Sequence, residues 1–198
     1  MSLRNRLKAA LALPAPSRLL AGDLADLPDG QLSPAAVLVA ITDRSEPGVH
    51  FTLRRENMRS HAGQVAFPGG RIDPGEDVVT AALREAEEEI GLPPAAVALW
   101  GAADPYRTVT NFLVTPILGL VPPDLELFPH EHEVADLFEA PLSFVLDPAN
   151  QHCMSAEFRG ATRQYYQINW NGRRIWGATA AMLVNLTCRL QALESSKA

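Results

Sequence analysis

Runs of apolar residues separated by turn-forming residues divide the chain into short elements. Residues 35–42 are apolar and rich in β-branched side chains, which predicts a buried strand. A second strand is expected at Val49–Arg54, after the turn Ser45–Gly48, so the two strands predict a hairpin. The same criteria predict further strands at residues 97–101, 112–120, 134–139 and 164–168.

In the middle of the chain the apolar spacing changes to three and four residues. This stripe predicts a helix over residues 78–90. Asp77 is placed to cap its N-terminus, and Gly91 followed by Pro93-Pro94 to end it. Further helices are expected near the N-terminus, where Leu3, Leu7, Ala10 and Leu11 share one face, and over residues 178–193. Strands interleaved with helices predict an α/β fold, a sandwich on a mixed sheet.

Composition adds limits to this picture. A chain of 198 residues suits one domain, here residues 31–194, preceded by an N-terminal helical extension over residues 1–30. No apolar run is long enough to span a bilayer, so we expect no membrane partner. Cys153 and Cys188 form no disulfide framework, which favours reduced cysteines and a cytoplasmic protein. The net charge of −6 argues against nucleic acid as a partner.

The predicted central helix carries an acidic face. On a helical wheel Glu85, Glu88 and Glu89 lie together, whereas Glu87 points away from them. Like charges three and four residues apart repel, and oxygen-only ligands suit Mg²⁺ or Mn²⁺. Taken alone, such a face is more often only solvated, so the residues around it have to decide between the two interpretations.

The surrounding residues form a longer pattern. It consists of Gly70, Glu76, Arg84-Glu85, Glu88-Glu89 and Gly91-Leu92. This pattern resembles the Nudix box, although Ala86 is smaller than the aliphatic residue usual there. The resemblance implies a Nudix-type α/β/α sandwich and a metal-dependent hydrolase that cleaves a diphosphate bond.

The resemblance also implies roles for individual residues. Glu85, Glu88 and Glu89 would hold Mg²⁺ or Mn²⁺, with the Gly70 carbonyl as a further ligand. Either Glu85 or Glu88 would act as the catalytic residue that orients or deprotonates the attacking water.

Two further box residues are expected to support the site. Arg84 and Glu76 would form a pair that fixes the helix against the preceding loop. Glu87 is expected to be a solvated side chain without a role.

A second signature lies upstream of the box. It consists of Thr52, Arg54, Arg59, Gly63 and Phe67–Gly70, and it resembles the coenzyme A pyrophosphatase branch of the Nudix family. His50-Phe51 and Arg55 depart from that motif. The resemblance implies hydrolysis of coenzyme A to 4′-phosphopantetheine and adenosine 3′,5′-diphosphate. Arg54, Arg59, His61 and Gly69 would bind the substrate, because arginine forks suit phosphate.

Several alternatives remain open from the sequence. The substrate could be another nucleoside diphosphate derivative, such as ADP-ribose, a dinucleotide or a nucleoside triphosphate, or the domain could be a non-catalytic nucleotide sensor. Glu131 or Glu133 could reach the site from a loop. The aromatic residues Tyr165, Tyr166, Trp170 and Trp176 could pack in the core or line a substrate pocket. A homodimer is neither required nor excluded.

Overall fold

The computed structural model describes residues 1–23, 31–56, 63–158 and 160–196. In that part of the chain the larger sheet contains β1 (Ser33–Thr42), β2 (Gly48–Arg54), β3 (Val65–Ala66), β4 (Gly69–Arg71), β5 (Ala98–Ala102), β6 (Tyr106–Arg107), β7 (Phe112–Val121) and β8 (Val134–Pro141). A smaller antiparallel sheet contains β9 (His152–Phe158), β10 (Ala161–Trp170) and β11 (Arg173–Trp176). The α-helices are α1 (Leu3–Leu11), α2 (Val78–Ile90), α3 (Leu142–Val145) and α4 (Ala178–Ser195), with short 3₁₀ turns at Pro94–Ala96 and Pro148–Asn150.

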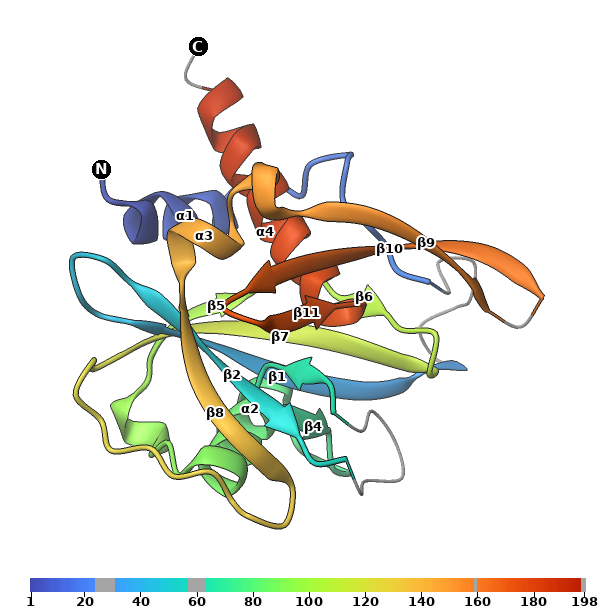
Figure 1. Cartoon of the computed structure of the whole chain (residues 1–198). Helices are drawn as coiled ribbons and strands as arrows, with labels where there is room; N and C mark the ends of the chain where they lie inside the picture. Colours follow the sequence, from blue (N-terminus) through green and yellow to red (C-terminus); the bar gives the residue numbers. More distant parts are fainter. Residues whose placement is uncertain (24–30, 57–62, 159, 197–198) are drawn as a thin grey trace.

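The larger sheet is mixed and has β1 at its centre. β1 pairs in parallel with β7 along its whole length, and antiparallel with β2 and β4. β2 in turn pairs with β3 and β8. Helix α2 covers one face of this sheet, and α4 with the smaller sheet covers the other (Figure 1). The predicted α/β sandwich on a mixed sheet is therefore confirmed.

Strand β1 separates two apolar cores. Its alternate residues Ala36, Leu38 and Ala40 pack with α2, whereas Val39 and Ile41 pack with α4 and the smaller sheet. A strand covered on both faces is continuously apolar, which is why this segment shows no polar alternation.

Helix α2 begins and ends where its sequence predicts. The Asp77 side chain accepts hydrogen bonds from the backbone N–H groups of Val79 and Thr80, at 2.8 and 2.9 Å. Gly91 follows the helix with φ of 67°, the left-handed conformation that glycine adopts without strain. The inner face is lined by alanines, which bring the helix close to the sheet.

Helix α1 packs beside α4 (Figure 1). Leu7 and Ala10 are buried in the same core as α4, which confirms the predicted apolar face of α1. No helix of the described residues has the length and apolarity needed to cross a bilayer.

Of the smaller sheet, the sequence predicted only residues 164–168, which lie in β10. Asn171 and Gly172 have φ of 47° and 75° and connect β10 to β11. Positive φ at both central residues is typical of a tight hairpin turn, for which Asn-Gly is the preferred sequence. That dipeptide was the signal that could have identified this hairpin.

Candidate active site

The outer side of α2 lies against the backbone of β4. A Cβ atom added at Gly70 would come within 2.3 Å of the Glu85 Oε1 atom, so only glycine leaves room for this carboxylate. A Cβ at Gly69 would come within 2.4 Å of the Ala36 carbonyl oxygen on β1. Gly69–Arg71 form a short strand paired with β1. The two glycines let this strand fit closely between β1 and α2.

Glu89 is the most buried carboxylate of the site, with a side chain only 4% exposed. Its Oε2 accepts a hydrogen bond from the Gly69 N–H at 3.2 Å, and its Oε1 lies 3.4 Å from Arg54 Nη1. The pKa of Glu89 is raised to about 7, mainly by burial; Arg54 and the Gly69 N–H lower it, and the nearby Glu85 and Glu133 add to the rise. The fold thus holds Glu89 where its charge is poorly solvated.

Arg84 joins the helix to the loop before it. Its Nε and Nη2 donate to the two carboxylate oxygens of Glu76, at 2.9 and 3.1 Å. Nη2 also donates to the Arg71 carbonyl at 3.1 Å, and Nη1 to Glu85 and Glu88 at 3.0 and 3.2 Å. The two bonds from Arg84 to Glu76, together with a bond from the Asp73 N–H, lower the pKa of Glu76. The Arg84–Glu76 pair expected from the sequence is therefore present.

The three glutamates of the predicted acidic face have different surroundings. Burial raises the pKa of Glu85, and Glu88 and Glu133 raise it further, against Arg84. Glu88 is 62% exposed and contacts Arg84. Glu87 is also exposed, and its side chain has no polar partner among the described residues. The face therefore consists of two carboxylates turned toward β4 and one at its solvent-exposed rim.

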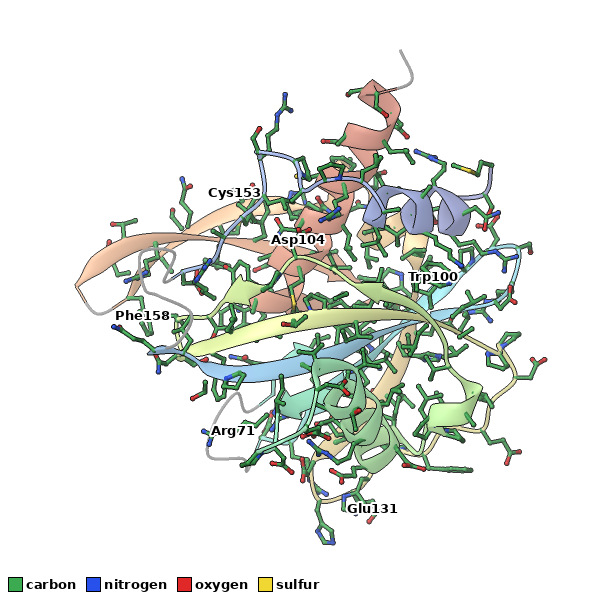
Figure 2. The ribbon with its side chains drawn as sticks, turned by 180° about the vertical axis from the view of Figure 1, so that it is seen from behind. Arg71, Trp100, Asp104, Glu131, Cys153 and Phe158 are labelled. Carbon is green, nitrogen blue, oxygen red and sulfur yellow. The ribbon has the colours of Figure 1, made fainter. Side chains whose placement is uncertain are left out.

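A loop after β7 closes over the end of α2. The Phe128 and His130 N–H groups donate to the carbonyls of Ile90 and Glu89, at 3.0 and 2.8 Å. Glu133 then lies near enough to raise the pKa of both Glu85 and Glu89, whereas the Glu131 carbonyl accepts a bond from Arg55. Figure 2 places Glu131 at the same end of the molecule as α2. Of the two loop glutamates, Glu133 is the one whose charge acts on Glu85 and Glu89.

The chain is similar to known proteins in both sequence and fold. A family model described as the NUDIX domain matches residues 32–171. The chain belongs to the Nudix family. It is 40% identical over 157 residues to an uncharacterized Nudix hydrolase NudL of Enterobacter sp. (strain 638), covering 79% of this chain and 82% of that protein. The protein of the same name from Cronobacter sakazakii is 41% identical with the same coverage.

A solved structure shares the fold. The Nudix hydrolase RenU from M. smegmatis superposes with a TM-score of 0.54 and 19% identity, covering 83% of this chain and 86% of RenU. The chain is a Nudix hydrolase, an enzyme of the pyrophosphatase class. Nudix hydrolases generally use divalent metal ions such as Mg²⁺ or Mn²⁺.

The Nudix carboxylates fit such an ion by their donor chemistry. Glu85, Glu89 and Glu133 repel one another, and all their donor atoms are oxygen, which Mg²⁺ and Mn²⁺ prefer. Within the described residues no three acidic, histidine or cysteine side chains already converge on one point. Instead, Arg84 and Arg54 bind the carboxylates from either side.

Only part of the upstream signature lies within the described residues. Arg54 reaches Glu89, and its Nε is buried without a partner in the described part of the chain. Gly69 directs its N–H at the same carboxylate. Arg59 and His61, also predicted to bind substrate, lie outside the described residues.

The four C-terminal aromatic residues separate into two groups. Trp170 stacks on Phe138 with ring centroids 5.8 Å apart, and Tyr166 packs against the core. Trp176 lines a cleft, and the Tyr165 ring lies edge-on to it with ring centroids 5.8 Å apart. The first pair is structural, and the second lies at the surface of the smaller sheet.

Proposed function

We propose that this Nudix enzyme hydrolyses the diphosphate bond of coenzyme A or its derivatives, giving 4′-phosphopantetheine and adenosine 3′,5′-diphosphate. One observation carries the proposal. Arg54 and Gly69, which belong to the upstream signature, both contact Glu89, which belongs to the box. The signature that resembles the coenzyme A branch and the box therefore form one site.

The proposed roles follow from this arrangement. Glu85, Glu88, Glu89 and the Gly70 carbonyl would hold Mg²⁺ or Mn²⁺, which neutralises the diphosphate and lowers the pKa of water. Glu85 or Glu88 accepts the proton of the attacking water. We add Glu133 to the residues that complete the negative charge of the site, because it raises the pKa of its neighbours.

The remaining residues position the substrate. Arg84 and Glu76 keep α2 fixed against its loop. Arg54 is held loosely, at 3.4 Å from Glu89, so it is available to donate to a phosphate oxygen. The substrate would also be bound by Arg59, His61 and Gly69. The two free cysteines favour a cytoplasmic enzyme.

The test compares substrates in one assay. The purified chain is incubated in ¹⁸O-water with Mg²⁺ or Mn²⁺ and equal concentrations of coenzyme A, ADP-ribose, a dinucleotide or a nucleoside triphosphate. Mass spectrometry of the products gives the activity and the phosphorus attacked. We expect coenzyme A to have the highest kcat/KM. A higher kcat/KM for another compound would replace coenzyme A as substrate, and binding without turnover would favour a sensor.

A further inference from the structure

The cleft lined by Trp176 lies beside the smaller sheet. Its volume is about 640 Å³. It lies between the start of β3 and the turn that connects β10 to β11, two segments that contact each other. The residues that matter for its chemistry are Leu53, Gln64, Gly172, Arg173, Arg174 and Trp176.

Arg174 is a cation that is held in place without a counter-charge. Its Nε donates to Gln167 Oε1 at 2.6 Å, and its Nη2 donates to the Tyr165 hydroxyl at 3.0 Å. Its guanidinium lies 4.7 Å from the centroid of the Trp176 ring. Among the described residues no carboxylate pairs with it. Its remaining N–H donors are free to face the cleft, since a guanidinium has more donors than these two bonds use.

The neighbouring arginine is arranged differently. Arg173 pairs with Asp136 at 2.5 Å and lies over the Phe138 ring at 4.2 Å. Its charge is therefore neutralised within the protein. The chain has a net charge of −6, so an arginine that is held in place without a carboxylate partner is unusual in it. Such an arginine suits an anionic ligand, which supplies the missing negative charge.

The cleft is close to the carboxylates but separate from them. Leu53, which lines the cleft, directly precedes Arg54, which contacts Glu89. Leu53 packs against the apolar core on the α4 side of the larger sheet, whereas α2, which carries Glu89, covers the other face, so the cleft and the acidic site lie on opposite sides of the sheet. A group bound there is therefore a different group from the scissile diphosphate.

We propose that this cleft binds a phosphomonoester on the nucleoside part of the substrate, with Arg174 as the principal donor. The proposal rests on the proposed function, in which the nucleoside of coenzyme A carries such a 3′-phosphate. Gln167, Tyr165 and Trp176 fix the guanidinium in advance, so little side-chain freedom is lost on binding. Recognition at this position selects 3′-phosphorylated substrates over those that lack this phosphate.

A binding experiment tests the cleft without catalysis. Adenosine 3′,5′-diphosphate and adenosine 5′-monophosphate are titrated by calorimetry in EDTA into the wild type, Arg174→Gln, Arg174→Lys and the control Arg18→Gln. Arg18 is an exposed arginine near Cys188, which lies on α4. We expect Arg174→Gln to weaken the bisphosphate about tenfold, since a charge-assisted hydrogen bond is lost, and the monophosphate much less. Arg174→Lys should lie between, and Arg18→Gln should match the wild type.

A kinetic experiment separates the cleft from the catalytic site. In Arg174→Gln the KM for coenzyme A should rise about tenfold with kcat unchanged, while the KM for 3′-dephospho-coenzyme A stays constant. Equal loss for both substrates, or no loss for either, would overturn the cleft assignment. If the wild type does not hydrolyse coenzyme A, the proposed function fails, and the calorimetric titration still decides whether Arg174 binds the phosphomonoester.

Discussion

Arg84 and Arg189 bind carboxylates in the same way but serve different regions of the molecule. Arg84 joins α2 to its loop through both oxygens of Glu76, and its side chain is 28% exposed. Arg189, on α4, binds both oxygens of Asp104 at 2.5 and 2.7 Å, and its side chain is 9% exposed. Figure 2 shows Asp104 above the larger sheet, on the side away from α2. Both arginines use the fork geometry of the guanidinium.

The surroundings of the two arginines differ in charge balance. Arg189 has one carboxylate, and its Nη1 donates to the carbonyls of Ala10 and Leu13, at 3.2 and 2.9 Å. The Asp104 carboxylate balances its charge, and its contact with the Ala10 carbonyl links α4 to α1. Around Arg84 and Arg54, the nearby carboxylates outnumber the arginines. They are Glu76, Glu85, Glu88, Glu89 and Glu133. The matched cluster stabilises the fold, and the unmatched cluster keeps negative charge for a metal ion.

The largest expected effect is on activity, at Glu85. Glu85→Gln should lower kcat on the order of 10³-fold at saturating metal, because stabilisation by a bound metal is worth several kcal/mol. The melting temperature of the metal-free variant should not fall, since burial already raises the pKa of this carboxyl. Full turnover at saturating Mg²⁺ would remove Glu85 from the proposed machinery. Steady-state kinetics and thermal denaturation make the two measurements.

The reverse pattern is expected at Arg189. Arg189→Met should lower the free energy of unfolding by about 3–5 kcal/mol, because it leaves the mostly buried Asp104 unpaired. Below its melting temperature the variant should keep its kcat. The double variant Arg189→Met, Asp104→Leu should recover part of the loss, as urea denaturation would measure. A single variant as stable as the wild type would mean that this cluster does not hold α1 in place.

Glu89 should make the stability of the metal-free protein depend on pH. Its pKa is raised, so the folded state holds the proton more tightly than the unfolded chain, and ionisation opposes folding. The free energy of unfolding in EDTA should therefore fall as pH rises from about 4.5 to about 7, by up to about 3 kcal/mol. Glu89→Gln should remove this fall. Identical profiles for wild type and variant in urea denaturation would contradict the assignment.

The sequence predicted the matched and unmatched clusters unequally. The resemblance to the Nudix box indicated Glu76 and Arg84, and helix periodicity, which is local, placed Glu85 on the acidic face. The Arg189–Asp104 pair joins residues 85 positions apart, and nothing local in the sequence indicates it.

The same limit applies to the position of the loop glutamates and to the smaller sheet. The choice between Glu131 and Glu133 depended on how the loop docks on α2, which is a tertiary contact. β9 is exposed along its whole length, so it lacks the apolar alternation by which strands are predicted. β11, on the other side of β10, is short, and the Asn-Gly turn between β10 and β11 was the one local signal available.

A smaller effect is expected for Arg84→Lys. Lysine keeps the charge but cannot bridge both oxygens of Glu76. The Mg²⁺ concentration for half-maximal activity should rise about 10- to 100-fold, with most of kcat restored at high Mg²⁺. The matched control Arg189→Lys should change the melting temperature and leave the Mg²⁺ dependence unaltered. If both variants shifted only stability, Arg84 would be equivalent to Arg189, and the contrast between the two clusters would be lost.

The smallest effect is expected at Glu87, and it separates specific contacts from net charge. Glu87 lies on the same helix as the three proposed ligands, but its side chain is exposed and has no polar partner in the described residues. Glu87→Gln removes the same charge as Glu85→Gln. If the metal is attracted only by the overall field of α2, both variants should raise the Mg²⁺ requirement similarly. If individual carboxylates hold it, Glu87→Gln should change stability by less than about 0.5 kcal/mol and leave activity near the wild-type value, because exposed charges are screened by solvent and salt. Titration of activity with Mg²⁺ at constant ionic strength distinguishes these outcomes.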